Sequence, residues 1–245
     1  MRIGFEGRVA IVTGAAHGFG RAIALALAER GALVFGCDVL AMADAAGVTG
    51  VRLDVGDRAA VQLAVGEIVA EAGRVDVLVN NAGGVCGQVG RPIEEVEAAD
   101  WQAIFAVNLS GAFFMSQAVA PAMKRQGSGR IVNISSGAGL GVSLTGIQAY
   151  ASAKAGQIGL TRQLAHELGP FGITVNNVAP GFVRSNPATE RQWEAMGAEG
   201  QARLLQSVAL RRPGRAEDIA AAVMFFASEQ AGWITGQVLS VDGGK

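Results

Sequence analysis

Tyr150 and Lys154 stand four positions apart in a stretch of sequence that we expect to be helical. Residues four apart on a helix share one face, so a phenol and an ammonium group would point into the same site. A nearby positive charge lowers the pKa of a phenol, which can then donate and accept a proton near neutral pH. Taken alone, the pair also fits a surface tyrosine beside a solvated lysine, so its meaning depends on the rest of the chain.

A glycine-rich turn near the N-terminus predicts a nucleotide site. The apolar run at 9–12 has the character of a buried strand and leads directly into Thr-Gly-Ala-Ala-His-Gly-Phe-Gly at 13–20. An alanine-rich helix is expected at 21–29, and a strand, a glycine turn and a helix in this order place a pyrophosphate against the helix N-terminus. The glycine spacing, Gly-x-x-x-Gly-x-Gly, differs from the commoner Gly-x-Gly-x-x-Gly, and a turn without a ligand is the alternative. The residues expected to bind the dinucleotide here are Gly14, His17, Gly18, Phe19 and Gly20.

Asp38 ends a second predicted strand, at 33–38, and lies 18 positions after Gly20. A carboxylate at about this separation binds the adenosine ribose hydroxyls, and its charge repels a 2′-phosphate. The adjacent residues, Cys37 and Val39, supply no basic group. The sequence therefore favours NAD over NADP, with an aspartate that caps the following turn as the alternative.

Further short motifs follow in a fixed order along the chain. They are Asp-Val at 54–55, Asn-Asn-Ala-Gly at 80–83, Asn108, Ser136, the Tyr150 and Lys154 pair, Pro-Gly at 180–181 and Val-Asp-Gly-Gly at 241–244. With these motifs the chain resembles the short-chain dehydrogenase/reductase family of single-domain oxidoreductases, over a span from Gly7 to Gly244. The resemblance implies hydride transfer between a nicotinamide cofactor and an alcohol or ketone.

The resemblance gives a role to each of four catalytic candidates. Tyr150 is expected to protonate the alkoxide that forms when a ketone gains hydride, or to remove the proton in the oxidative direction. Ser136 would bond the substrate oxygen, and Lys154 would lower the pKa of Tyr150 and bind the nicotinamide ribose. Asn108 would hold a water molecule in a proton relay. Since asparagine is a poor helix former, we also expect a local irregularity at this residue.

Ser135 remains an alternative to Ser136. Thirteen residues separate Ser136 from Tyr150, near the long end of the spacing in the family, so the intervening loop could carry an extra residue. Ser135 also suits a structural role, because serines often satisfy backbone groups at strand ends.

The remaining cofactor contacts are implied at the carboxyl ends of strands, where open α/β sheets bind ligands. This set includes the catalytic pair and extends from the adenine side of the cofactor to its nicotinamide side. Its members are Asp54, Val55, Asn81, Gly83, Tyr150, Lys154, Pro180, Gly181 and Val183. The substrate is expected to contact Ser136, Gln148, Tyr150 and Arg184.

Substrate choice is expected to depend on the segments 84–91 and 139–148 and on a polar, partly helical lid near 184–207. Arg184 follows the nicotinamide clasp and suits a carboxylate or a hydroxyl-rich substrate, since arginine can bind a carboxylate through two parallel hydrogen bonds. Alternatively, Arg184 points to solvent or pairs with an acid in a neighbouring segment.

Three functions remain open on this basis. The first is an NAD-dependent oxidoreductase for a small polar substrate, such as a sugar, a polyol or a sugar-derived acid. The second is a 3-oxoacyl thioester (acyl carrier protein) reductase or a general ketone reductase. The acyl carrier role usually needs NADP and a basic surface for the acidic carrier protein. The third is a non-catalytic dinucleotide-sensing protein, in which a catalytic residue would be expected to be missing.

Strands and helices must alternate along the chain to position these residues. We expect strands at 9–13, 33–38, 50–54, 76–80, 129–135, 172–178 and 237–241, and helices near 18–30, 57–72, 100–126, 150–169 and 216–228, with a short one at Ala41 to Ala46. The pattern predicts one α/β domain over residues 1–245, a Rossmann-like doubly wound parallel sheet of about seven strands with helices on both faces.

Composition limits the class of protein. A chain of 245 residues, half of them hydrophobic, can bury a full core, and its net charge of −1 indicates neither a nucleic-acid nor a membrane-surface partner. The N-terminus has no leader pattern, and no uninterrupted apolar run reaches the ~18 residues of a membrane span. Two cysteines are too few for a disulfide framework. We expect a cytoplasmic protein without a metal site, with a small-molecule substrate and, by resemblance, a homotetrameric assembly.

Overall fold

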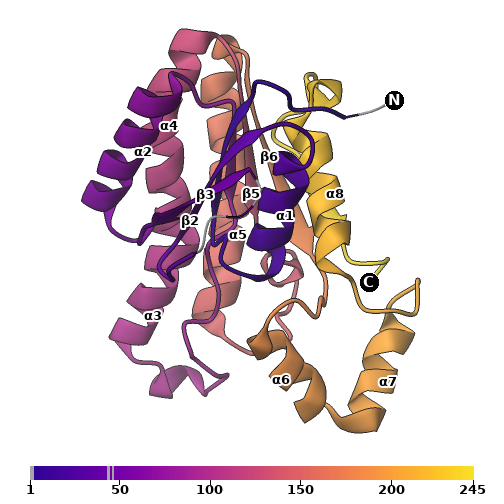
Figure 1. Cartoon of the computed structure of the whole chain (residues 1–245). Coiled ribbons are helices and arrows are strands. Elements are labelled where there is room, and N and C mark those ends of the chain that lie inside the picture. The colour runs from indigo at the N-terminus through magenta and orange to yellow at the C-terminus, as the bar shows by residue number, and fades with distance from the viewer. Residues whose placement is uncertain (1–2, 43–44, 46) are drawn as a thin grey trace.

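The computed structural model describes residues 3–42, 45 and 47–245, and its centre is one parallel sheet of seven strands (Figure 1). The strand order is β3-β2-β1-β4-β5-β6-β7, and each neighbouring pair is parallel. The direction of winding reverses between β1 and β4, which makes the sheet doubly wound. The predicted fold class is confirmed.

The strands form where short apolar runs rich in β-branched residues occur, as expected for strands buried on both faces. Their bounds are β1 Val9–Thr13, β2 Leu33–Asp38, β3 Val48–Arg52, β4 Val77–Asn80, β5 Gly129–Ile134, β6 Ile173–Pro180 and β7 Val238–Val241. The third strand begins and ends two residues earlier than the predicted 50–54, so Asp54 lies beyond it.

The longer helices begin and end at recognisable capping signals. Asp57 accepts hydrogen bonds from the backbone of Ala59 and Ala60 at the start of α2, and Gly73 and Gly127 adopt left-handed conformations after α2 and α4. The helices are α1 Gly18–Ala28, α2 Arg58–Ala72, α3 Ala98–Phe105, α4 Gly111–Gln126, α5 Gln148–Leu168, α6 Pro187–Ala195, α7 Gly197–Ser207 and α8 Ala216–Ala227.

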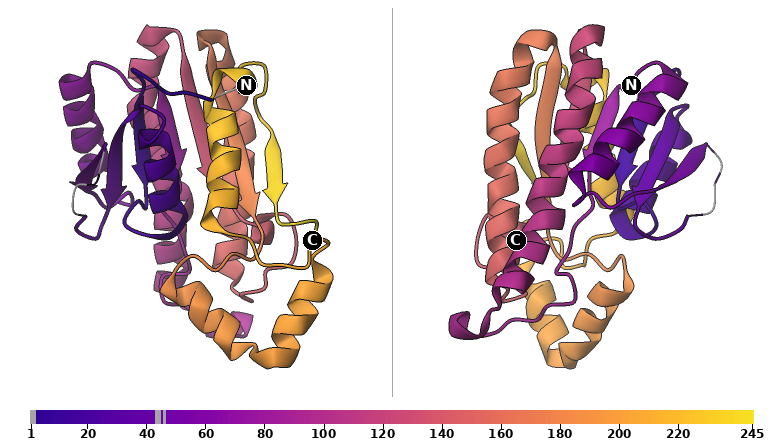
Figure 2. Two further views of the ribbon diagram at one scale, coloured as in Figure 1. Left: turned by 45° about the vertical axis from the view of Figure 1, so that its right-hand side comes forward. Right: turned by 90° about the vertical axis from the view of Figure 1, so that its left-hand side faces the viewer.

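Helices cover both faces of the sheet (Figure 2), and two hydrophobic layers fill the space between them and the sheet. Along β1, Ala10 and Val12 join one layer and Val9 and Ile11 join the other, because successive strand side chains point to opposite faces. Helices α1 and α8 contribute to the first layer, and α2, α4 and α5 contribute to the second. The helices on both faces therefore fix the sheet, and the loops at its carboxyl edge are free to build a site.

A row of three asparagines crosses the middle of the sheet. Asn80, Asn133 and Asn177 are aligned in register on β4, β5 and β6, and all three are buried. The Asn80 amide donates to Asn133 Oδ1 at 2.8 Å, and the amides of Asn133 and Asn177 both donate to Thr161 Oγ1 of α5, at 2.9 and 3.3 Å. Hydrogen bonds thus tie the three neighbouring strands β4, β5 and β6 to α5 directly below the carboxyl edge.

Two helical predictions differ from the structure. The expected helix at 100–126 is divided into α3 and α4 by a π-helical turn at Ala106–Ser110. The short helix expected at Ala41 to Ala46 falls partly on residues 43, 44 and 46, which lie outside the described residues, while Ala41 and Met42 have no helical structure and Ala45 bridges Val48.

The helical run Ala98–Gln126 is long and apolar enough to cross a membrane by length and composition alone. In the fold this run packs against α2 and α5 and against the sheet, as the core helix of a globular domain does. The described residues offer no other helix of that kind.

Candidate active site

Thr13 and Asn81 draw together the ends of β1 and β4, where the strand order reverses. Thr13 Oγ1 accepts hydrogen bonds from the backbone N–H groups of Asn81 and Ala82 at 3.0 and 2.9 Å. In return, the Asn81 side chain donates to the carbonyls of Thr13 and Gly14 at 2.9 and 3.1 Å. This bridging role of Thr13 was not predicted from the sequence.

The glycine turn closes so tightly that side chains would not fit. Gly14 has a φ of +67°, and a Cβ built on it would lie 2.8 Å from Asn81 Nδ2. A Cβ on Gly20 would lie 2.0 Å from the carbonyl oxygen of Gly14. The side chain of His17 is exposed and does not cap α1, so it leaves the first N–H groups of the helix open to an anion. Phe19 packs against the core beneath the turn.

Asp38 is held against this turn. Its carboxylate accepts hydrogen bonds from the backbone of Ala16 and Leu40, both at 3.0 Å, and it is nearly buried. The parallel register of β2 and β3 also places Arg52 opposite Asp38. Sequence reasoning missed this basic neighbour, because only strand pairing makes the two residues adjacent.

Asp54 and Val55 lie on the loop that follows β3. The exposed Asp54 carboxylate accepts a hydrogen bond from Gly56 N at 2.8 Å. Val55 is buried and fits against the start of α4, where a Cβ on Gly111 would come within 2.7 Å of Val55 Cγ2. Val55 therefore packs against α4, and a contact of either residue with adenine stays a prediction.

Tyr150, Lys154 and Ser136 meet at the carboxyl end of β5. Tyr150 occupies the first turn of α5 and is hydrogen-bonded to Ser136, and Lys154 Nζ lies 5.8 Å from the centre of the Tyr150 ring. The buried Lys154 ammonium donates to the carbonyl of Ile134 at 2.8 Å. The helical spacing of the pair thus puts both groups on the face of α5 that meets the end of this strand.

Burial shifts the pKa values of Tyr150 and Lys154 in opposite senses. Burial raises the pKa of Tyr150, and the hydrogen bond with Ser136 offsets part of that rise. Burial lowers the pKa of Lys154 to about 8. Lys154 is therefore mostly protonated below that pH, and its charge favours the ionised form of the nearby phenol.

Asn108 lies at the centre of the π-helical turn, so the predicted local irregularity is confirmed. Its side chain accepts from Gly84 N at 3.0 Å and donates to the carbonyls of Gly84 and Ile104 at 2.8 Å each. A Cβ on Gly83 would lie 2.6 Å from Asn108 Oδ1 and 3.1 Å from Lys154 Nζ. The structure therefore brings Gly83, Asn108 and Lys154 together around one small space.

The two serines at the end of β5 have different surroundings. The hydroxyl of Ser135 is buried and donates to Asn177 Oδ1, next to the asparagine row. Ser136 Oγ accepts from Ala138 N at 3.2 Å and faces Tyr150. The geometry favours Ser136 as the substrate-facing serine and gives Ser135 a structural role.

The predicted nicotinamide clasp lies where β6 ends. Pro180 is the last residue of β6, and Gly181 N donates to the carbonyl of Val241 at 3.0 Å. Val183 is buried and bridges Gly214 in a parallel pairing. This segment leads directly into the lid, and a Cβ on Gly18 of the glycine turn would lie 3.3 Å from the carbonyl oxygen of Ser185.

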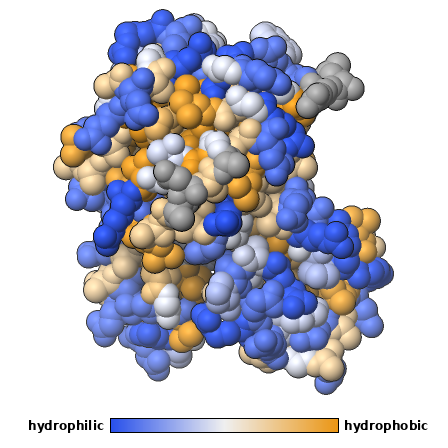
Figure 3. All heavy atoms as spheres, in the orientation of Figure 1, coloured by the Kyte–Doolittle hydropathy of each residue, from blue (hydrophilic) through white to orange (hydrophobic). Residues whose placement is uncertain are grey.

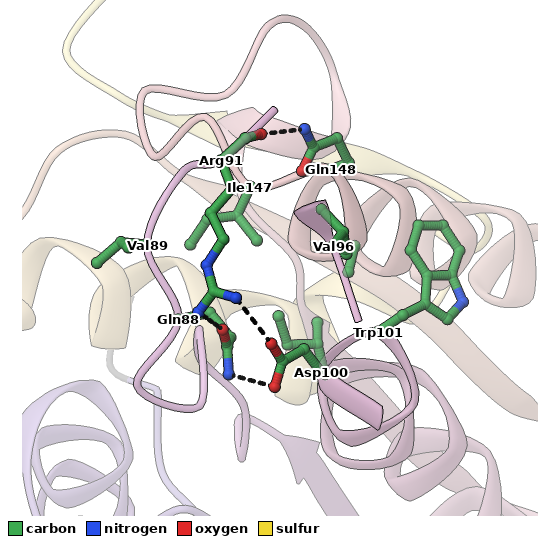
Figure 4. Close-up of a pocket in the computed structure, with 10 residues that line it drawn as sticks. Gln88, Val89, Arg91, Val96, Asp100, Trp101, Ile147 and Gln148 are labelled. Atoms are coloured by element: carbon green, nitrogen blue, oxygen red, sulfur yellow. Dashed lines mark hydrogen bonds and ion pairs between the residues drawn. The ribbon is translucent and has the colours of Figure 1, made fainter. Parts of the chain in front are cut away.

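Four polar side chains line a small pocket near the site, beside apolar residues such as Val96, Trp101 and Ile147 (Figure 4). Gln88 Nε2 and Arg91 both donate to the Asp100 carboxylate, at 2.8 and 3.3 Å, and Arg91 also donates to Gln88 Oε1 at 3.0 Å. Gln148, two residues before Tyr150, donates to the carbonyl of Arg91 at 2.8 Å. The sequence indicated the segments 84–91 and 139–148 as substrate determinants but not Asp100, which joins this pocket from α3.

Arg184 is engaged within the lid. Its guanidinium donates to both carboxylate oxygens of Glu190, the shortest distance being 2.7 Å, and lies 5.3 Å from the ring centre of Trp193. Phe182 stacks on the same ring at 5.9 Å. The structure thus shows the alternative in which Arg184 pairs with a neighbouring acid, and contact with a substrate stays a prediction.

The glycine cradle and the catalytic groups fit a dinucleotide that runs from Asp38 to Tyr150. A Cβ on Gly14, Gly20 or Gly83 would meet Asn81, the Gly14 carbonyl or Asn108 of the protein itself, so these glycines keep the turn and the loop closely packed. The first N–H groups of α1 are left uncapped, as binding of a pyrophosphate requires. In the described part of the chain, no group of three or more His, Cys, Asp or Glu residues could hold a metal ion.

Comparison with known proteins gives the class. A family model described as enoyl-(acyl carrier protein) reductase matches residues 14–245. The chain is 42% identical to the 3-oxoacyl-[acyl-carrier-protein] reductase FabG of Escherichia coli strain K12, covering 98% of each chain. It is 41% identical to the cyclohexanol dehydrogenase of Rhodococcus sp. strain TK6, covering 98% of this chain and 96% of that one. The solved structure of Thermoplasma acidophilum aldohexose dehydrogenase matches with a TM-score of 0.90 at 31% identity, covering 98% and 94%.

The fold, the site and these relatives define a nicotinamide-dependent oxidoreductase that acts on CH–OH or keto groups. The chain belongs to the short-chain dehydrogenase/reductase family, as its motifs predicted. A purely sensory dinucleotide-binding protein is therefore set aside.

Replacing Tyr150 by Phe should leave the fold and cofactor binding intact and lower kcat by at least ~10²-fold, the low end for a general acid–base group. The ring is retained and only the ionisable hydroxyl is lost, so the change isolates the proton-transfer role. Steady-state rates and cofactor titration by fluorescence measure the two effects. Turnover near the wild-type level in Tyr150→Phe would contradict the assignment.

Proposed function

We propose that this protein is an NAD-dependent dehydrogenase or reductase that interconverts a secondary alcohol and a ketone on a small polar substrate. The observation that carries the proposal is the meeting of Tyr150, Ser136 and Lys154 at the end of β5, between the glycine turn and the lid. The proposal includes the single-domain organisation over residues 1–245, the lid near 184–207 and a cytoplasmic location.

The residues divide the reaction between them. The cofactor supplies the hydride chemistry at the carbonyl carbon. Ser136 donates a hydrogen bond to the substrate oxygen as negative charge develops there, and Tyr150 gives that oxygen its proton. Lys154, charged at neutral pH, stabilises the resulting phenolate, and Asn108 holds the loop at Gly84 that covers this side of the site.

The preference for NAD rests on Asp38. Its buried carboxylate is fixed by two backbone N–H groups beside the glycine turn, where an adenosine ribose would lie. Arg52, its cross-strand partner, is the group that could soften this preference, because it brings a positive charge to the same end of the sheet.

The carboxylate at position 38 should make kcat/KM higher with NAD than with NADP. In Asp38→Asn, the charge is lost and one oxygen remains to accept from Ala16 N or Leu40 N. The preference should therefore fall by about 10- to 100-fold, which corresponds to a charged hydrogen bond of ~1.5–3 kcal/mol. Initial rates with both cofactors measure the ratio. A wild-type enzyme that prefers NADP would refute this interpretation of β2.

A polar substrate is supported by the walls of the site. Gln88, Arg91, Asp100 and Gln148 supply polar groups to one side, next to apolar residues such as Val96, Trp101 and Ile147, and α6 and α7 present a largely hydrophilic surface in the lower right of Figure 3. The likeness to an aldohexose dehydrogenase agrees with a sugar or a polyol. Binding of a sugar-derived acid through Arg184 requires that the carboxylate of the substrate compete with Glu190 for the guanidinium.

A 3-oxoacyl thioester reductase is the second candidate. It is favoured by the 42% identity to a 3-oxoacyl-[acyl-carrier-protein] reductase over almost the whole of both chains. The net charge of −1 and the carboxylate of Asp38 argue against it, since such an enzyme would need a basic surface for an acidic carrier and usually NADP. A panel of sugars, polyols, aldonates and 3-oxoacyl thioesters, assayed with both cofactors by the absorbance of the reduced nicotinamide, separates the two candidates.

Arg184 and its partner provide a sharper test of an acidic substrate. Arg184→Ala should lower kcat/KM selectively on the best aldonate, by the equivalent of roughly 1.5–3 kcal/mol, with little change on a neutral polyol. Glu190→Gln should act in the opposite sense, because it frees the guanidinium without removing it. Equal changes on both substrates in either variant would show that Arg184 only stabilises the lid.

A homotetramer is the proposed assembly, with a small molecule as substrate and no nucleic-acid or membrane partner. Trp233 is fully exposed and Leu239 of β7 and Phe225 of α8 are partly so, which leaves an apolar face beside the edge strand. An unpaired edge strand with apolar neighbours is well suited to isologous pairing.

Light scattering at micromolar concentration should give about four times the chain mass of 25.0 kDa. Trp233→Lys, which places a charge on the apolar face, should shift the distribution toward smaller species while leaving the fold intact by circular dichroism. A monomeric mass for the wild-type protein would contradict the proposal.

A further inference from the structure

Two chain segments, which we call the legs of the lid, connect the lid to the rest of the protein. The entry leg, 181–186, leads into α6, and the exit leg, 208–214, leaves α7 (Figure 1). The legs are joined at their base, where Gly214 N donates to the carbonyl of Phe182 at 3.0 Å and Gly214 bridges Val183. A Cβ on Gly214 would lie 2.7 Å from Val183 Cγ2, so this junction is closely packed.

The exit leg is also tied to the C-terminal end of the chain. Leu210 N donates to the carbonyl of Gly243 at 3.0 Å, and Ala209 N donates to that of Gly244 at 3.3 Å. Asp242 Oδ1 accepts from Gly244 N at 2.9 Å, which stabilises the bend after β7. Figure 2 shows the strand β7, in yellow, running toward the lid so that the chain end lies beside the exit leg.

This arrangement requires glycine at two successive positions. Gly243 and Gly244 have φ values of +72° and +83°, a region that other residues adopt only with strain. A Cβ on Gly243 would lie 2.7 Å from Cγ1 of Val208, the residue at which α7 ends. A Cβ on Gly244 would lie 2.9 Å from Cβ of Ala209. The two glycines therefore permit a contact with the exit leg that any side chain would disturb.

The same C-terminal segment touches the proposed nicotinamide clasp from its other side. Gly181 N donates to the carbonyl of Val241 at 3.0 Å, and a Cβ on Gly181 would lie 2.7 Å from both Cα and Cβ of Asp242. Residues 242–244 consequently lie between the clasp and the exit leg, in contact with each.

We propose that residues 242–244 form a clamp that sets the position of the lid over the substrate site, with Gly243 as a positioning residue for substrate binding. The clamp fixes the end of α7 relative to Gly181, so the lid and the cofactor clasp keep one geometry. The effect on substrate binding rests on the proposed function, whereas the effect on the mobility of the lid does not.

Gly243→Ala tests the clamp, and Gly73→Ala is its matched control. Gly73 ends α2 with a φ of +74°, almost the value at Gly243, but a Cβ there meets nothing within 4 Å. Both variants place a side chain at nearly the same positive φ, and only the first disturbs the contact with Val208. Melting temperatures compare the overall loss of stability in the two variants.

Two measurements address the clamp itself. Limited trypsin digestion should cut at Arg191 and Arg203, both exposed in the lid, several times faster in Gly243→Ala than in Gly73→Ala, because native-state proteolysis follows local opening. With the best substrate of the panel, KM should rise roughly three- to tenfold in Gly243→Ala with kcat less affected, since uniform binding is lost. The dissociation constant for NAD should stay within about twofold in both variants.

A double-mutant cycle with Val208→Ala locates the effect. Removing Cγ1 of Val208 relieves the contact with a new Cβ at position 243, so Gly243→Ala should raise the cleavage rate less in the Val208→Ala background than in the wild type. Equal cleavage and KM in Gly243→Ala and Gly73→Ala, or additive effects in the cycle, would overturn the clamp. If no substrate of the panel is turned over, the proposed function is wrong. The digestion rates of Gly243→Ala and Gly73→Ala then still test the clamp.

Discussion

The buried ammonium of Lys154 is the group around which the site is organised. An unpaired charge in the interior is costly, and it persists where hydrogen bonds and nearby dipoles compensate. Here the Ile134 carbonyl accepts a hydrogen bond from the ammonium, Asn108 Oδ1 lies close by across Gly83, and the Tyr150 ring lies at one side. These partners come from β5, from the π-helical turn and from α5, so the position of one charge depends on three elements keeping their mutual places.

The π-helical turn is part of that compensation. The Asn108 amide bonds the carbonyl of Ile104, four residues earlier, and so competes with the helix backbone, and it also bonds both backbone groups of Gly84. Gln157, one turn beyond Lys154 on α5, is fully buried and donates to the carbonyl of Asn108 at 3.2 Å. The long apolar helices therefore supply packing to the sheet and also a polar lining on the side of the catalytic groups.

The sequence predicted the family, the sheet and the catalytic candidates because these depend on local pattern. Apolar runs marked the strands, the spacing of Tyr150 and Lys154 marked one helix face, and a mid-helix asparagine marked the irregularity at 106–110. The sequence did not predict contacts that depend on strand register or on the meeting of segments far apart in the chain. Arg52 becomes a neighbour of Asp38 only through the pairing of β2 with β3, and Gly243 meets the exit leg only after the sheet is complete. For Arg184, the sequence left open whether the side chain binds a substrate or pairs with a nearby acid. The structure shows that it pairs with Glu190.

The row formed by Asn80, Asn133 and Asn177 has a consequence for how the chain reaches this fold. A parallel strand buried on both faces carries little information about its own alignment, because apolar side chains fit almost equally well after a shift. A shift of β5 by one residue would turn the Asn133 amide away from Thr161 and toward the layer that holds Val132 and Ile134, where it would lose its partners at a cost of about 1–3 kcal/mol. The amides thus select the native alignment among near-equivalent misfolded ones, so their main contribution is to the uniqueness of the native state.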